Sequence, residues 1–202
     1  SSPMKLNGSF LDVCRRVVDR SDRTVEYWFF PNVAGLRYRD CRMQIEHRLP
    51  GAVVYPKLDF DAYRDCISRC DVYFGSYPFG GANIGVDAML QGLPPIVFEG
   101  PEPHSRTDKR FVHLFGLPEW LIARSEQQYE KAAMRLIQND EERCTIARQI
   151  LDANPEEMLF SKEQSAYPTD FVDTVWWLYE NHERVKASDR RVWTWEDRLA
   201  VS

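Results

Sequence analysis

Hydrophobic residues recur along the chain with two spacings, one typical of helices and one typical of buried strands. Apolar residues three or four positions apart predict helices from Phe10 to Val18 and from Tyr129 to Ile137. Short apolar runs lie between such helices, at positions 25–30, 52–55, 72–74, 95–98 and 121–123. Strands that alternate with helices predict an α/β fold, with a Rossmann-like parallel sheet and helices on both faces. The last run, being short, is expected to be an edge strand.

Polar residues ahead of the helical patterns indicate where the helices begin. A side-chain oxygen at the N-cap accepts a hydrogen bond from a free backbone amide, and Ser and Asp are well suited to that position. We expect N-caps at Ser9 and Asp59, and capping boxes at Ser105 with Asp108 and at Ser125 with Gln128. An apolar face on the helix after Asp59 would include Phe60 and Tyr63.

The segment from residue 77 to residue 98 has the pattern of a glycine-rich turn, a short helix and a buried strand. Exposed backbone amides at such a turn, next to the positive end of a helix, can bind a diphosphate. We therefore expect the amides of Gly81, Ala82 and Asn83, with the Asn83 carboxamide, to face a diphosphate. Asp87 follows in the helix, where its carboxylate can accept a hydrogen bond from a ribose hydroxyl. The segment predicts a nucleotide-sugar site, although a structural turn and a helix-dipole carboxylate are the alternatives.

Charge and composition narrow the choice of partners. The 202 residues include 26 basic and 31 acidic side chains, for a formal net charge of −5. Without a basic excess we expect no nucleic-acid partner. No apolar run approaches the roughly 20 residues needed to cross a bilayer, so we expect no membrane span. Five scattered cysteines do not indicate a disulfide framework and favour a cytoplasmic location.

The pattern changes near residue 160. Residues 1–160 carry the alternation of strands and helices and are expected to form a nucleotide-sugar-binding domain. Residues 161–202 are expected to form a helical extension with a broad apolar face at positions 171–179. That face would pack on the first domain or on a domain outside this chain.

Four motifs, spread over about residues 2–151, resemble glycosyltransferase family 41. They lie at positions 4–11, 29–31, 78–87 and 116–123, and the last of these, Gly-Leu-Pro-Glu-Trp-Leu-Ile-Ala, is the most specific. The family includes the eukaryotic O-GlcNAc transferase and the bacterial cytoplasmic N-glycosyltransferases that modify adhesins. The bacterial branch is the more similar of the two.

This resemblance implies a GT-B enzyme with two Rossmann-like halves, of which this chain is the C-terminal, donor-binding half. It implies a UDP-hexose donor, an acceptor protein or peptide modified on Asn or Ser/Thr, and inversion at the sugar carbon. It also implies that the reaction needs no metal and no cofactor. The family places the acceptor site and a proposed catalytic His in the preceding N-terminal half. That missing half is an expected partner, and no catalytic residue is assigned in this chain.

Individual positions acquire roles from the same resemblance. Lys5 matches a lysine that contacts the donor phosphates, and Ser2 matches a hydroxyl position facing them. Leu58 and Tyr63 match positions near the uracil, and His104 lies in a loop that would border the donor sugar. A solvated lysine, a core tyrosine and a surface histidine are the alternative interpretations. Some relatives carry a hydroxyl or an imidazole where Ala82 stands, so only its backbone can contribute here.

Two other functions fit the same residues. One is a non-catalytic nucleotide-binding or interaction module, which the loss of a polar side chain at Ala82 would allow. The other is a different GT-B enzyme such as a UDP-sugar epimerase. The match over residues 116–123 counts against the epimerase.

Overall fold

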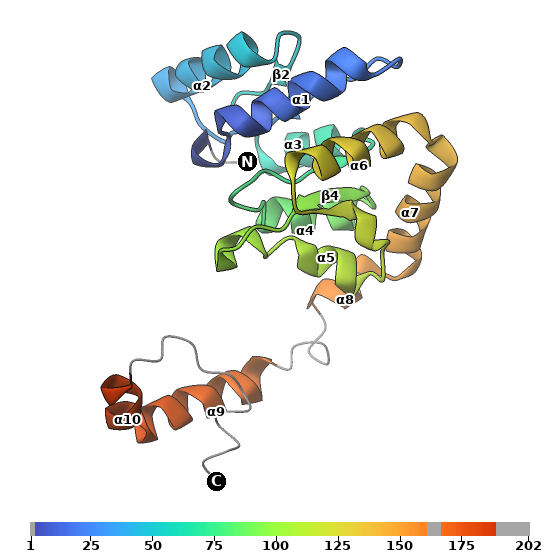
Figure 1. Cartoon of the computed structure of the whole chain (residues 1–202). Coiled ribbons are helices and arrows are strands. Elements are labelled where there is room, and N and C mark those ends of the chain that lie inside the picture. The colour runs from blue at the N-terminus through green and yellow to red at the C-terminus, as the bar shows by residue number, and fades with distance from the viewer. Residues whose placement is uncertain (1–2, 161–166, 189–202) are drawn as a thin grey trace. The chain divides into compact units, whose positions relative to one another are not determined.

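The computed structural model describes residues 3–160 and 167–188. Contacts group the chain into two units, Ser1–Leu159 and Phe160–Ser202. The first unit contains the strands and most of the helices, and the second contains two helices (Figure 1). Each unit is described by itself below.

The first unit alternates helices and strands in the order that the hydrophobic pattern predicts. It begins with a 3₁₀ helix, Pro3–Lys5, and continues with α1 (Gly8–Arg20), β1 (Trp28–Phe29), α2 (Gly35–Arg48), β2 (Val53–Val54), α3 (Phe60–Ile67), β3 (Tyr73–Phe74) and α4 (Asn83–Leu90). After these come β4 (Pro95–Phe98), a 3₁₀ helix at Pro103–Ser105, α5 (Lys109–Leu114), a 3₁₀ helix at Glu119–Leu121, β5 (Ile122–Ala123), α6 (Glu126–Gln138), α7 (Asp140–Asp152) and α8 (Pro155–Phe160).

All strand pairs of the first unit are parallel, as predicted. β1 pairs with β2, and β4 lies between β3 and β5. The prediction that residues 121–123 form an edge strand is confirmed, since β5 pairs with β4 alone among the described strands. Helix α6 covers one face of β4, while α4 and α5 lie on the other (Figure 1). Parallel strands with helices on both faces confirm the predicted fold class.

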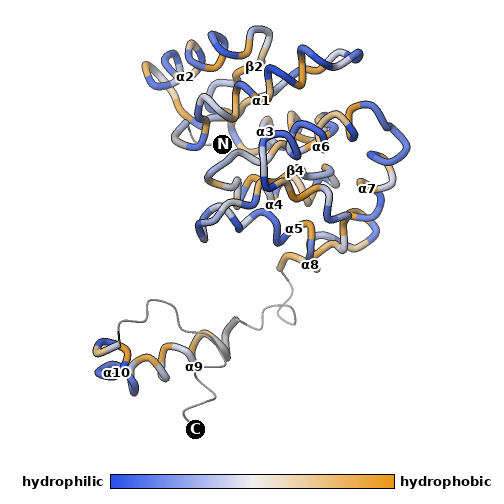
Figure 2. The backbone as a smooth tube through the Cα atoms, viewed as in Figure 1, coloured by the Kyte–Doolittle hydropathy of each residue, from blue (hydrophilic) through white to orange (hydrophobic). Residues whose placement is uncertain are grey.

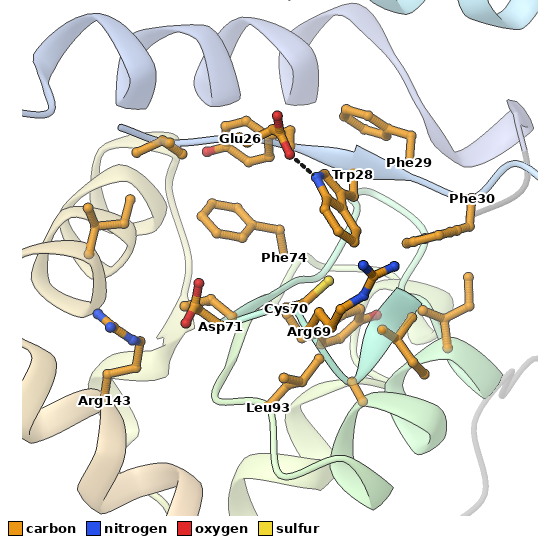
Figure 3. Close-up of a pocket in the computed structure, with 18 of the residues that line it drawn as sticks. Glu26, Trp28, Phe29, Phe30, Arg69, Cys70, Asp71, Phe74, Leu93 and Arg143 are labelled. Atoms are coloured by element: carbon orange, nitrogen blue, oxygen red, sulfur yellow. Dashed lines mark hydrogen bonds between the residues drawn. The ribbon is translucent and has the colours of Figure 1, made fainter. Parts of the chain in front are cut away.

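The sheet is interrupted between β1 and β3. No backbone pairing joins these two strands in the described part of the chain, and a cavity of about 460 Å³ separates them. Trp28 and Phe74 point into this cavity, and the Arg69 guanidinium lies 5.4 Å from the Trp28 ring centroid (Figure 3). The Tyr27 and Phe74 rings meet edge to face at 4.9 Å. Aromatic contacts therefore connect the two parts of the sheet where backbone hydrogen bonds do not.

The core of the first unit is centred on β4 and α6. Ile96 and Val97 of β4 are fully buried, and Figure 2 shows the hydrophobic residues of this strand inside the unit. Tyr129 of α6 is also fully buried, and its hydroxyl donates a hydrogen bond to the Gly75 carbonyl at 3.0 Å. The ring of Phe10 from α1 packs edge-on against Tyr129. The two helical faces predicted from apolar spacing are therefore core faces.

The predicted helix starts were correct at two sites and wrong at two. Asp59 caps α3 by accepting from the Ala62 amide at 2.9 Å, and Ser125 caps α6. The first helix begins earlier than expected, because Asn7 and not Ser9 is its N-cap. The capping box at Ser105 and Asp108 does not form. The Ser105 hydroxyl bonds the Glu102 carbonyl, and the Asp108 carboxylate bonds a different segment.

One predicted core position was also wrong. Phe60, at the start of α3, is 66% exposed. It is the first residue of the helix, where the guanidinium of Arg64 lies 5.7 Å from its ring centroid. An aromatic ring at a helix end can be covered by such a cation without entering the core.

The second unit contains α9 (Tyr167–Glu180) and α10 (His182–Ala187). Several large apolar side chains of α9 are exposed, namely Phe171, Val172, Val175, Trp176 and Tyr179. This is the apolar face predicted for the C-terminal extension. None of the described helices has both the length and the apolar character to span a membrane.

A carboxylate on α6 connects that helix to α1. Glu130 is 7% exposed, and it accepts a hydrogen bond from Arg16 Nε at 3.0 Å and another from Arg20. Arg16 also bonds Glu126 at 2.8 Å. A nearly buried carboxylate is stable here because both of its oxygens are paired with guanidinium groups.

Replacing Glu130 by Ala should lower the free energy of unfolding by about 1–2 kcal/mol. The reason is that two guanidinium groups would lose their charged acceptor at the α1–α6 contact. Chemical denaturation by urea measures the change. Glu141→Ala is the matched control, because Glu141 is exposed on α7, and its effect should stay within about 0.5 kcal/mol. Equal losses for both variants would contradict this role of Glu130.

Candidate functional site at the glycine turn

The glycine turn follows β3 and is fixed by the segment that enters α1. Lys5 Nζ donates a hydrogen bond to the Gly80 carbonyl at 2.6 Å. Asn7 donates to the Tyr77 carbonyl, while its side-chain oxygen caps α1 by accepting from the Phe10 amide at 2.9 Å. Residues about 70 positions apart in sequence are therefore joined at one turn. The structure places Lys5 at the turn where the sequence predicts a diphosphate.

Two of the three amides expected to face that diphosphate have a partner within the protein. The Gly81 amide donates to Asp108 Oδ2 at 2.6 Å, and the Ala82 amide donates to Asp108 Oδ1 at 3.0 Å. Asp108 is only 3% exposed. Asn83 is exposed, and its amide has no hydrogen-bond partner among the described residues. The turn does bind an anion in this structure, and that anion is a side chain of the same chain.

The two glycines at the turn are required by close packing. A Cβ atom on Gly81 would overlap the hydroxyl of Tyr73, a buried residue of β3. A Cβ atom on Gly80 would overlap the Asp108 carboxylate and approach Thr107 Oγ1 to 2.7 Å. Since glycine alone lets a backbone come this close, the sequence motif has a direct physical reason.

Tyr63 and Asp87 lie together at the carboxyl side of the sheet. The Tyr63 hydroxyl donates to Asp87 Oδ2 at 3.0 Å, and its ring meets the Phe30 ring edge to face at 5.4 Å. Burial, reinforced by the Asp87 carboxylate, raises the pKa of Tyr63 above its ordinary value. The hydroxyl therefore stays protonated and orients Asp87. The sequence placed both residues near a nucleoside but did not predict this contact.

The other predicted positions lie in loops or outside the described residues. Leu58 is half-buried in the loop between β2 and α3. His104 is exposed in the 3₁₀ helix Pro103–Ser105, and its ring stacks on Phe79 with centroids 4.3 Å apart. Ser2 lies outside the described residues. The structure thus adds Phe79, and above all Asp108, to the set that the sequence identified.

Cationic side chains near the carboxyl ends of β4 and β5 differ in their partners. Lys109 and Arg124 both pair with Glu99, at the carboxyl end of β4, and they lower the pKa of that carboxyl group. Arg106 instead donates to two backbone carbonyls, those of Gly100 and Pro101. Like Lys5, it has no carboxylate partner among the described residues, so both keep a net positive charge for an incoming anion. Within residues 3–160 and 167–188, no three His, Cys, Asp or Glu side chains are grouped as metal ligands would be.

Gly81→Ala should lower the free energy of unfolding by about 1–3 kcal/mol, since the Tyr73 hydroxyl it would meet is buried and cannot move aside. Urea denaturation measures the loss. Gly8→Ala is the matched control. Its Cβ would meet only the flexible end of Arg48, and alanine in a helix should be neutral or stabilising by up to about 1 kcal/mol. A Gly81→Ala protein as stable as Gly8→Ala would show that the turn is not packed as described.

Comparisons with known proteins were made by sequence and by structure. No protein-family model matches the chain. Two curated relatives are each 31% identical to it over 177 residues, which is 87% of this chain and 28% of the relative. Both are named UDP-glucose:protein N-β-glucosyltransferase, and they come from Actinobacillus pleuropneumoniae serotypes 5b and 7. The chain thus spans less than a third of the length of these relatives.

A solved structure of similar fold is a mutant O-GlcNAc transferase from Thermobaculum terrenum. It superposes with a TM-score of 0.73 over 91% of this chain and 35% of the other, at 15% sequence identity. The identity is too low to show more than a shared fold. The sequence matches confirm the resemblance to bacterial protein N-glycosyltransferases that the motifs indicate, and the solved structure confirms the shared fold.

Proposed function

We propose that this protein binds the donor substrate of a UDP-sugar-dependent protein glycosyltransferase. The observation that carries the proposal is that α4 connects a glycine turn bonded by Lys5 to the Asp87 carboxylate bonded by Tyr63, on a chain similar to named glucosyltransferases. A lysine suits a diphosphate, and an oriented carboxylate suits a ribose. The positive end of the α4 dipole lies at Asn83, between the glycine turn and Asp87 in sequence.

The reaction proposed is hexose transfer with inversion, without a metal or cofactor. An Asn or Ser/Thr side chain of an acceptor protein attacks the anomeric carbon, the bond to the diphosphate oxygen breaks, and UDP leaves. Negative charge grows on that oxygen during the transfer. Lys5 and the Asn83 amide, the first of α4, would stabilise this charge. Hydrogen-bond donors that are held in position before the reaction do this well, because they need not reorient as the charge grows. The hexose is glucose in the name of the curated relatives.

The nucleoside would lie beside the carboxyl ends of β1, β2 and β3. There Tyr63 fixes Asp87 through a hydrogen bond, so the carboxylate is already oriented to accept from a ribose hydroxyl. Leu58 would offer its backbone to the uracil, and His104 would border the sugar. Ligands of open parallel sheets bind at this end of the strands.

The acceptor site and the catalytic base belong, in this proposal, to an N-terminal half that pairs with this chain. A cytoplasmic location is part of the same proposal. The five cysteines, Cys14, Cys41, Cys66, Cys70 and Cys144, are all unpaired here, as expected in a reducing compartment.

A non-catalytic nucleotide-binding module is the second candidate. The observation favouring it is that Asp108 already occupies two amides of the turn and that Ala82 contributes no polar side chain. Such a module would bind a nucleotide weakly or not at all, and it would not transfer a sugar.

Calorimetry with UDP tests donor binding. Lys5→Ala and Asp87→Asn should each weaken the affinity for UDP tenfold or more, because each removes a charged contact worth about 1.4 kcal/mol. Lys57→Ala and Asp61→Asn are matched controls, since both residues are exposed and have no side-chain ion pair among the described residues. Chelation by EDTA should leave the affinity unchanged. Absence of UDP binding by the wild-type protein would refute the proposal.

A transfer assay separates the two candidates. The intact protein, with UDP-glucose and an acceptor peptide containing Asn and Ser/Thr, should release UDP and gain the mass of one hexose on the peptide. Mass spectrometry measures the product. If the intact protein transfers no hexose and binds UDP weakly or not at all, the second candidate is correct.

A further inference from the structure

The Asp108 carboxylate accepts hydrogen bonds from several groups, and the resemblance assigns it no role. Besides the amides of Gly81 and Ala82, the Tyr73 hydroxyl donates to it at 3.1 Å and the Thr107 hydroxyl lies at 3.2 Å. A buried carboxylate is tolerated when its oxygens are hydrogen-bonded in this way. The arrangement joins β3, the turn and the start of α5.

The carboxylate binds the turn from its inner side. Asp108 is 3% exposed, and the Gly81 backbone is buried as well. A Cβ atom on Gly75, at the end of β3, would lie 3.5 Å from Asp108 Oδ2, which places the carboxylate between the strand and the turn. The amides of Gly81 and Ala82 therefore both point toward this buried carboxylate, while the Ala82 residue itself is exposed.

The same contacts determine what the turn presents outward. Ala82 has a φ of 48°, and a positive φ costs a non-glycine residue about 1 kcal/mol or more. The hydrogen bond from its amide to Asp108 holds it there. Asn83, the next residue, begins α4 with an exposed side chain and an amide that has no partner in the described part of the chain.

We infer that Asp108 is a positioning residue, which holds the glycine turn from beneath so that Asn83 and Lys5, and not the Gly81 and Ala82 amides, contact the donor diphosphate. This inference rests on the proposed function and makes it more specific. It predicts that UDP binds with the Asp108 hydrogen bonds intact. The alternative is that the Asp108 carboxylate occupies the position of the diphosphate itself, in which case the diphosphate would displace it.

Amide NMR of the full 202-residue chain, titrated with UDP, tests the inference directly in the wild-type protein. The Asn83 amide resonance should shift strongly, while the resonances of Gly81 and Ala82 keep the downfield positions of carboxylate-bonded amides. Loss of those positions on UDP binding would mean that the carboxylate is displaced, and it would overturn the inference while leaving the proposed function standing. No shift anywhere would refute the proposed function and the inference together.

Asp108→Asn adds a second, independent measurement. The carboxamide has nearly the same shape but can accept from one amide while its NH₂ group opposes the other, so the turn should loosen and the affinity for UDP should fall tenfold or more. In the intact transferase the KM for the UDP-sugar should rise by a similar factor, with kcat changed less than threefold. Tyr73→Phe keeps both amide contacts and should weaken UDP binding less than threefold. Tighter UDP binding by Asp108→Asn would overturn the inference.

Discussion

The shape of the candidate site depends on a buried negative charge under the glycine turn. Asp108 fixes Gly81 and Ala82, and this determines which amide α4 offers to solvent. From the other side, Lys5 and Asn7 hold the carbonyls of the same turn. The turn is thus bound through its amides by the residue that precedes α5 and through its carbonyls by the segment before α1. Preorganisation of this kind lets a site bind an anion without first reorganising its own dipoles.

Much of the fold followed from local pattern. The alternation of strands and helices, the apolar faces containing Phe10 and Tyr129, and the cap at Asp59 depend on neighbouring residues, so spacing and residue type revealed them. The Ser105–Asp108 capping box was wrong because the carboxylate bonds a turn 26 residues earlier. No local pattern records such a long-range contact, and capping statistics assume that a side chain serves its own helix.

The site was predicted in part for the same reason. Glycines that close packing requires can be recognised as a motif in the sequence, and so can the helix that begins next to them. The partners that make those glycines necessary, Tyr73 and Asp108, are ordinary residues of a strand and a helix start. The hydrogen bond from Tyr63 to Asp87 joins two different helices, α3 and α4. It could be found only once the fold brought the two helices together.

The interrupted sheet has a mechanical consequence. Between β1 and β3 the first unit contains a partly open cavity of about 460 Å³ where a continuous sheet would have a row of hydrogen bonds. Contacts between side chains, such as that of Tyr27 with Phe74, therefore hold the two parts of the sheet together at this point. Phe30 and Tyr63 line this cavity, and Tyr63 also stands at the proposed nucleoside position. A base bound beside Tyr63 would therefore add contacts across this cavity.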